Sequence, residues 1–422
     1  MPLLDKRASV LSHILTLVIL LANMLLPKTG VAQETLDIGL LIANKSQRSA
    51  YHQLAVQFEK AYPNITINYI VQDDKHYKHA IDTWLQQETG PDVLYWQAGN
   101  RLKKMAASNL IEPLDTLWLE QRWGEDFPLD IQHTLRYNQR IYALPYAFYQ
   151  WGIYYKKSLF SSLNLSVPET WDAFLEVCAA LKQKGINPIV IGGKDSWSVA
   201  AWFDYLNLRI NGLDFHQQLM NGAIPYTDKR VVQVFNTWKK LIDLKYVVFT
   251  VDNKNWQEAL PYIYHDIAGM TLLGTFAKHH ISNLRSDDIG FFRFPQLKSH
   301  MPLYEETPIE VFMIPKNAQH KESARLFLTF VGQHKVQTKL NLALGYDSPY
   351  LYATAHRLYP VDSSAPVGQR HGVIAQYFDR DTHKAMSLKG IEIMAEFLTT
   401  ADVSRATSEL EKARLRAFSQ AP

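Results

Sequence analysis

The sequence predicts an α/β protein built from two lobes, and three observations lead to this prediction. The chain has 422 residues, which is more than one ordinary hydrophobic core holds. Its N-terminal part alternates strands with helices, the order typical of a mostly parallel sheet covered by helices. No internal repeat and no low-complexity linker separates the halves, so we expect short crossovers between the lobes.

The first lobe should begin with the order strand, helix, strand, helix, strand. The strands are expected at residues 36–42, 65–71 and 92–96, and the helices at 51–62 and 76–87. Pro63 ends the first helix, and Gly90 with Pro91 separates the second helix from the third strand. Ligands bind at the carboxyl ends of parallel strands, where this pattern places Trp96 and Gln97.

The rest of the chain continues the alternation of helices and strands. Helices are expected at residues 170–185, 197–210 and 230–244, and strands at 188–191, 289–294 and 310–314. The tail from Val367 onward is mainly helical, and its charged last segment, 404–418, should lie on the surface.

Composition argues against a nucleic-acid-binding protein. Apolar residues make up 47% and charged residues 20% of the chain, as in soluble globular proteins. The formal net charge of +3 is small, and basic residues occur singly or in pairs such as Lys103-Lys104 and Lys239-Lys240. We therefore expect no nucleic-acid partner, and we expect a monomer.

The N-terminus has the pattern of a secretory signal peptide. Lys6 and Arg7 precede the apolar run 14–26, which is followed by Pro27 and by small residues up to Ala32. The run is too short to span a bilayer comfortably, although an uncleaved anchor is the alternative. No cysteine lies at the expected cleavage point, so the mature protein should be periplasmic without a lipid anchor there.

Residues 141–160 include eight aromatic side chains and no acid. Aromatic rings with polar tips suit two places: a packed core strand, or a surface on which the C–H face of a sugar stacks. Because side chains alternate along a strand, only part of this set can face one side.

Several short motifs, in order along the chain, resemble a known family. They are 89–96 (TGPDVLYW), 109–115 (NLIEPLD), 140–146 (RIYALPY), 153–160 (IYYKKSLF), 168–174 (PETWDAF), 181–189 (LKQKGINPI), 202–209 (WFDYLNLR), 269–274 (GMTLLG) and Gly345. The ordered set resembles the family 1 extracellular solute-binding proteins, which are receptors of carbohydrate ABC importers and relatives of the maltose-binding proteins.

The resemblance implies a two-lobed periplasmic binding protein fold of type II, with a mainly parallel sheet in each lobe and the ligand cleft between them. By this analogy residues 1–32 are the signal peptide. Lobe 1 holds residues 33–143 and 308–346, and lobe 2 holds 144–307 and 347–422. The first crossover then falls at 143–145, where Pro145 fixes φ in the hinge backbone.

The resemblance also implies which residues bind the ligand. At the end of the third strand Trp96, Gln97 and Asn100 should enter the cleft, or form its rim with solvated polar groups. From the aromatic stretch we expect Tyr149 and Trp151 in the cleft. The rings assigned to the core instead are Tyr146, Tyr154 and Tyr155.

Further candidates lie on the helix that opens at Trp197 and Ser198, where Trp202 and Asp204 follow. For Trp202, packing in the core is at least as good an interpretation as sugar contact.

Two more candidates depart from the family pattern or leave alternatives open. Phe276 stands where the family usually has Trp, so its ring can stack but cannot donate a hydrogen bond. Glu310 is either a ligand acceptor or part of a salt bridge near the hinge.

Together these features predict a receptor that closes on a mono- or oligosaccharide and presents it to ABC permease subunits in the membrane. We expect no catalytic residue, no metal site and no cofactor. Two rivals are a periplasmic sugar sensor that docks a signalling membrane protein and a carbohydrate-active enzyme. A polyol or glycerol phosphate is an alternative ligand.

Overall fold

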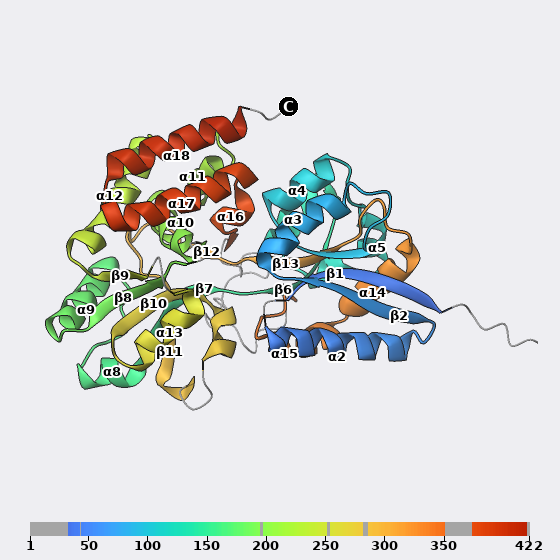
Figure 1. The fold of residues 1–422 in the computed structure, drawn as a ribbon, viewed down its shortest axis with the longest axis horizontal. Helices are drawn as coiled ribbons and strands as arrows, with labels where there is room; N and C mark the ends of the chain where they lie inside the picture. The colour runs from blue at the N-terminus through green and yellow to red at the C-terminus, as the bar shows by residue number, and fades with distance from the viewer. Residues whose placement is uncertain are drawn as a thin grey trace, which may run out of the picture.

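The computed structural model describes residues 33–42, 44–194, 197–250, 254–281, 286–350 and 374–419. They form two α/β lobes that lie side by side, as Figure 1 shows. The expected signal peptide (1–32) and the beginning of the expected helical tail (367–373) fall outside the described residues.

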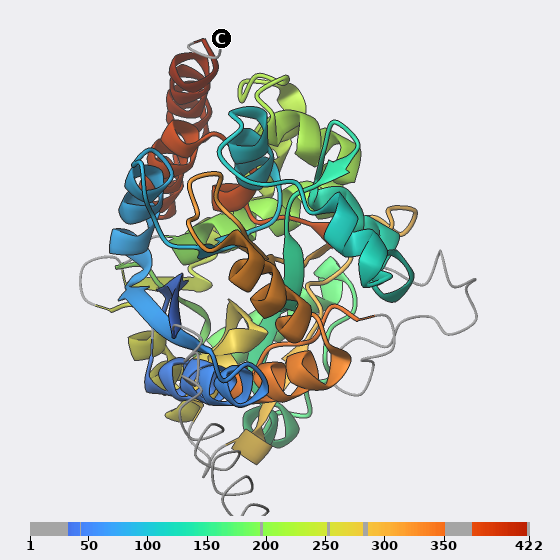
Figure 2. The ribbon, with the colours of Figure 1, turned by 90° about the vertical axis from the view of Figure 1, so that its right-hand side faces the viewer.

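The first lobe is built on a five-stranded sheet. Its strand order is β2 (Ile65–Gln72), β1 (Glu34–Leu41), β3 (Val93–Gln97), β13 (Ile309–Met313) and β6 (Leu144–Phe148). Its helices are α2 (Lys45–Ala61), α3 (Asp74–Trp84), α4 (Asn100–Ala107), α5 (Asp115–Glu120), α6 (Trp123–Asp126), α7 (Leu129–Thr134), α14 (Lys321–Val331) and α15 (His334–Leu344), with a small hairpin of β4 (Arg136–Tyr137) and β5 (Arg140–Ile141). Helices α2 and α15 lie side by side along one edge of this lobe (Figures 1 and 2).

The second lobe repeats this plan around a second five-stranded sheet. Its strand order is β11 (Ile289–Phe292), β7 (Trp151–Lys156), β10 (Ala268–Gly274), β8 (Asn187–Gly192) and β9 (Val247–Thr250). Its helices are α8 (Lys157–Ser162), α9 (Trp171–Gln183), α10 (Trp197–Asn211), α11 (Leu213–Met220), α12 (Lys229–Asp243), α13 (Trp256–Tyr264), α16 (Phe378–Asp381), α17 (Lys384–Thr400) and α18 (Val403–Phe418), with the 3-10 turns η1 (Thr275–His280) and η2 (Ser286–Asp288). A short pair, β12 (Glu305–Glu306) and β14 (Ile374–Ala375), joins segments that are far apart in the sequence.

The α/β class and the two-lobed fold are confirmed, but the expectation of mainly parallel sheets is wrong. In the first sheet β1 runs parallel to β2 and β3, whereas β13 runs antiparallel to β3 and to β6. The second sheet is mixed in the same way, because β7 runs antiparallel to β10 and β11. Strand β13 comes after the chain has returned from the second lobe, and it enters the first sheet in the direction opposite to β3.

The sheet of the first lobe includes residues that we expected in the second lobe. Strand β6 pairs with β13, and Pro145 lies opposite Val311 next to a shift of register. Proline has no N–H to donate, which suits this edge strand with its irregular pairing. Leu144 and Pro145 are buried within β6 of the first sheet, and we therefore propose that the first crossover lies at Tyr149 and Gln150, beyond the expected residues 143–145.

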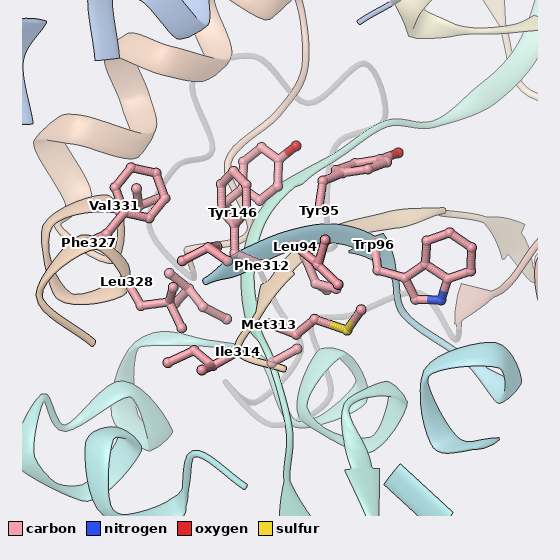
Figure 3. Packing of buried hydrophobic residues seen from close by; sticks show 14 of the residues in the cluster. Leu94, Tyr95, Trp96, Tyr146, Phe312, Met313, Ile314, Phe327, Leu328 and Val331 are labelled. Atoms are coloured by element: carbon pink, nitrogen blue, oxygen red, sulfur yellow. The ribbon is translucent and has the colours of Figure 1, made fainter. Parts of the chain in front are cut away.

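The core of the first lobe brings the end of β3 to the face of the cleft. Figure 3 shows the rings of Tyr146 and Phe312, which stack with their centroids 4.3 Å apart, among buried side chains of β3, β13 and α14. Trp96 extends from β3, away from the side chains of α14. Packing on one side of β3 thus fixes the position of the residues at its carboxyl end.

No helix in the part of the chain that the structure describes is long and apolar enough to cross a membrane.

Candidate functional site

A cavity of about 1570 Å³ lies between the two lobes. Its first-lobe wall comes from β3, α4 and β13, and its second-lobe wall comes from β7, α13, η1, α16 and α17. Typical pockets for small ligands measure roughly 300–1,000 Å³. This cavity therefore has room for a ligand with more than one ring.

Most of the predicted binding residues line this cavity. They are Trp96, Gln97, Asn100, Tyr149, Trp151, Trp197, Phe276 and Glu310. The rings assigned to the core lie elsewhere: Tyr146 and Tyr154 are buried away from the cavity, and Tyr155 packs against Phe160 and Phe292. Contact with a ligand remains a prediction for each lining residue.

Ser198, Trp202 and Asp204 do not line the cavity, so the predicted place of Ser198 and Asp204 is wrong. Helix α10 begins at the cavity with Trp197 and is then buried from Ser198 to Ile210. The Ser198 hydroxyl donates to the Gly192 carbonyl at 2.7 Å. Because the helix runs directly into the core of the second lobe, only its first residue reaches the cleft.

Trp202 packs in the core, the alternative that its sequence context had left open. Its ring lies edge-to-face against Phe294, with the centroids 5.6 Å apart, and near Phe174. It is 2% exposed.

Asp204 supports a helix that reaches the cleft. Its Oδ2 accepts a hydrogen bond of 2.8 Å from the backbone N–H of Phe378, the first residue of α16. Burial raises the pKa of Asp204 to about 7, and burial with the nearby charge of Asp204 raises the pKa of Glu306 well above its ordinary value.

Aromatic rings form most of the second-lobe wall. Trp151 stacks on Tyr377, with the centroids 5.0 Å apart and the planes inclined by 18°. Phe276 lies at the centre of the group and makes edge contacts of 5.1–5.7 Å with Tyr149, Trp151 and Trp256. These contacts hold several ring faces and edges around one space, an arrangement that suits an apolar ligand face.

A buried ion pair crosses the cavity from one lobe to the other. Arg380 of α16 donates to Glu310 of β13 at 3.0 Å and to the hydroxyl of Tyr149 at 2.6 Å. The hydroxyl of Tyr95 also donates to Glu310. Burial opposes the charge on Arg380, but Glu310 together with Tyr149, Tyr95 and Asp379 more than offsets this, so the pKa of Arg380 is raised well above its ordinary value. The salt bridge that we considered for Glu310 therefore exists, and Glu310 also lines the cavity.

Further polar contacts join the two walls near the opening of the cavity. The side-chain amide of Asn100 donates to the Asp381 carbonyl at 2.7 Å and to Asn221 Oδ1 at 2.6 Å. Lys78 of α3 lies 3.3 Å from Asp379, and Lys384 of α17 lies 2.5 Å from Asp82. These contacts exist only when the lobes approach each other.

Buried polar atoms of several lining residues have no protein hydrogen-bond partner among the described residues. Among them are Trp96 Nε1, Gln97 Oε1, Gln257 Oε1 and Arg380 Nη1. Of these four, two are donors and two are acceptors. Buried polar groups normally form hydrogen bonds, so these atoms are free to bind the hydroxyl groups of a ligand.

Sequence reasoning missed several residues that the structure brings to the cavity: Trp256, Tyr346, Tyr377 and Arg380. Tyr377 and Arg380 belong to the C-terminal tail, where the sequence indicated helices only. Their proximity to Glu310 depends on the pairing of β12 with β14, which no local pattern indicates. No group of three or more His, Cys, Asp or Glu side chains placed to hold a metal ion occurs within the described ranges.

Comparisons with known proteins agree with this architecture. Residues 43–338 match the model of a family described as bacterial extracellular solute-binding proteins. An ABC transporter extracellular-binding protein of Pyrococcus horikoshii is 25% identical over 86% of this chain and 83% of its own length. A multiple sugar-binding protein of Streptococcus mutans is 25% identical over 48% of this chain and 50% of its own.

Solved structures share the fold over nearly the whole chain. The bacterial solute receptor AcbH, with an exclusive preference for β-D-galactopyranose, superimposes with a TM-score of 0.81 at 25% identity, covering 91% of this chain and 98% of its own. A raffinose complex of the solute-binding protein RafE superimposes with a TM-score of 0.72 at 18% identity, covering 91% and 99%. The latter similarity is evidence for the fold alone.

Proposed function

The chain belongs to the family of bacterial extracellular solute-binding proteins, and we propose on this basis that it captures a mono- or oligosaccharide and delivers it to an ABC-type importer. The family consists of exported receptors and not of enzymes. Export through a signal peptide at residues 1–32, without a lipid anchor at its cleavage point, is part of the proposal.

The observation that carries the proposal is the combination of rings and unpaired polar atoms in one cavity. Phe276 and its aromatic neighbours offer apolar surface, while Trp96 Nε1, Gln97 Oε1 and Arg380 Nη1 offer hydrogen-bonding positions. A pyranose has an apolar C–H face and a rim of hydroxyl groups that both donate and accept. It therefore matches both parts of the cavity, which a purely apolar ligand would not.

Binding should favour the closed arrangement of the lobes. A ligand shifts a conformational equilibrium only through contacts that differ between the two states. Stacking on Trp197 and Phe276 needs the second lobe alone, whereas hydrogen bonds to Gln97 need the first lobe as well. A sugar that makes both sets of contacts stabilises the closed form, which the permease subunits would recognise.

The relatives support the proposed ligand class and partner. One is named as an ABC transporter extracellular-binding protein and another as a multiple sugar-binding protein. The structural neighbour AcbH prefers a monosaccharide, and it covers nearly the whole fold.

A thermal-shift screen tests the proposal, with the mature protein from Gln33 onward and a panel of neutral sugars, acidic sugars and polyols. A ligand at a hundredfold excess over its Kd raises the free energy of unfolding by about 2.7 kcal/mol, which a melting curve detects readily. Each hit is then incubated with the protein and analysed for products. A shift with the sugar recovered intact supports the receptor; no shift with any saccharide, or a consumed sugar, contradicts it.

A further inference from the structure

We propose that the ligand is an acidic oligosaccharide, whose carboxylate lies at the mouth of the cavity between Lys103, Lys104 and the start of α17. This inference rests on the proposed sugar-binding function and specifies the class of sugar. The mouth is defined here by Lys103 and Lys104 of α4 and by His383, Lys384 and Ser387 at the start of α17. Figure 1 shows α4 and α17 facing each other across the two lobes.

The first argument is that Lys103 and Lys104 form no direct ion pair with any described residue. Both line the cavity, and neither forms an ion pair or a side-chain hydrogen bond with another described residue. By contrast, Lys78 and Lys384 on the same cavity are paired with Asp379 and Asp82. Lys104 therefore contributes positive charge that no ion pair balances, and Lys103 adds charge that acts on the carboxyl of Asp381 without pairing with it.

The carboxylates that line the cavity do not balance this charge, because each already has a partner. Across the cavity Asp82, Asp379 and Glu310 pair with Lys384, Lys78 and Arg380. On α17 Glu392 and Glu396 pair with Lys389 and Arg405.

The two remaining acids of the lining are also engaged. Asp381 Oδ1 accepts from the Asn100 backbone N–H at 3.1 Å; burial raises the pKa of Asp381, while this hydrogen bond and the charge of Lys103 act in the opposite direction. Asp73 accepts hydrogen bonds from the backbone and the imidazole of His76.

The second argument is that the positive charge of α4 acts across the mouth on the start of α17. Burial, followed by the charges of Lys104 and Arg101, lowers the pKa of His383. Burial, followed by Arg101, likewise lowers the pKa of Lys104. The N-terminus of α17, a helix of 17 residues with no acid in its first turn, adds its dipole at the same place. Closure of the lobes concentrates these charges, so an anion between them would favour the closed form.

The third argument is the continuity of the mouth with the rings of the second-lobe wall. One cavity contains both Phe276 and Lys104, and its volume of about 1570 Å³ exceeds the usual size for a small ligand. A sugar chain with one ring stacked near Phe276 can extend toward the mouth. A carboxylate there would accept hydrogen bonds from one or both lysines, and such charge-assisted bonds are among the stronger ones.

Isothermal titration calorimetry on matched saccharides tests this inference. The probes are digalacturonic acid against galactobiose and cellobiouronic acid against cellobiose, measured at about 0.02 M and about 0.5 M salt. We expect at least one acidic member to bind about tenfold more tightly than its neutral counterpart at low salt, and most of this preference to vanish at high salt.

The double variant Lys103→Gln/Lys104→Gln should lose most of that tenfold preference and keep the affinity for the neutral sugar. The matched control is Lys239→Gln/Lys240→Gln, an adjacent lysine pair on α12 that does not line the cavity, and it should keep the preference. If neutral saccharides bind and no acidic member binds more tightly, or if the α4 variant keeps the preference, the inference is wrong while the proposed function stands. If neither class of saccharide binds, both are wrong.

Discussion

The two walls of the cleft differ in chemistry, although the two lobes share one plan. The second-lobe wall is mainly aromatic, with Trp151, Trp197 and Phe276 around one space. The first-lobe wall is mainly polar, with Gln97 and Glu310 at the ends of adjacent strands and basic side chains on α4. Aromatic rings bind a ligand through the area of apolar surface in contact. Amides and charged groups bind ligand atoms at particular positions, because hydrogen bonds are directional.

This difference indicates that the two walls contribute different interactions to ligand binding. We propose that a sugar stacks against the second lobe while the lobes are apart, and that its hydroxyl groups gain their hydrogen-bond partners only when the first lobe closes on it. The ion pair between Glu310 and Arg380 joins the two walls inside the cavity. Substitutions in each wall should therefore have different signatures in stability and in affinity, and the largest effect should come from the residues that join them.

The largest effect is expected from Arg380→Met. Glu310 is 2% exposed, so removal of Arg380 leaves a buried carboxylate without its counter-charge. Breaking a buried pair in this way costs about 3–5 kcal/mol. Urea unfolding without ligand should show this loss as a lower midpoint.

The double variant Glu310→Gln/Arg380→Met is the control for that experiment. It removes both charges, so it should recover much of the stability that the single variant loses. Equal stability of the single and double variants would mean that the pair does not hold the two walls together.

The second-largest effect is expected from Trp197→Ala in the aromatic wall. Trp197 is only partly buried and contacts Trp151 and Phe276 at the cavity. Loss of a stacking ring should weaken sugar binding by about 2 kcal/mol, or roughly thirtyfold in Kd. Calorimetric titration with the sugar found in the screen measures the change.

Trp202→Phe serves as the control, because its ring lies on the same helix but in the core. It should lower stability by about 1–3 kcal/mol and leave Kd within twofold. Similar losses of affinity in both variants would contradict the assignment of Trp197 to the cleft and of Trp202 to the core.

A smaller effect is expected from Gln97→Met in the polar wall. The Oε1 atom of Gln97 is buried without a protein partner, so a ligand hydroxyl is the expected donor. Loss of one such hydrogen bond should cost about 1 kcal/mol of binding free energy, roughly fivefold in Kd, and should not lower stability. The control is Gln53→Met, which alters an exposed glutamine on α2 and should change neither quantity. A gain in stability with unchanged Kd would mean that Gln97 does not bind the sugar.

Sequence patterns predicted most of the fold because its elements follow simple periodicities. The strands at residues 65–72 and 93–97 and the helices at 171–183 and 197–211 lie within a few residues of the expected bounds. The family resemblance also separated Tyr149 and Trp151, which line the cavity, from Tyr146, which packs on Phe312.

The same patterns failed where burial removed the contrast between the two faces of an element. Helix α10 is buried all round, so nothing in its sequence distinguishes a core side chain such as Trp202 from one at the cleft. Arg380 was missed for another reason. Its partners Glu310 and Tyr149 lie 70 and 231 residues away, and no local pattern indicates which of many arginines will meet them.

The smallest effect is expected from a titratable pair in the first lobe, away from the cavity. The hydrogen bond to Asp92 raises the pKa of His320 above its unfolded value of about 6.5. The charged pair therefore stabilises the fold fully below about pH 6.5, and this contribution is lost as pH rises through the folded pKa. The His320 side chain is 42% exposed, so solvent screening keeps the contribution below about 1 kcal/mol.

Urea unfolding should show His320→Gln destabilised at about pH 5.5 but close to the parent at about pH 8.5. His52→Gln, a surface control on α2, should show no such dependence. Because neither Asp92 nor His320 lines the cavity, sugar affinity should stay unchanged in His320→Gln. A change in affinity there would mean that the polar wall extends beyond the residues at the ends of β3 and β13.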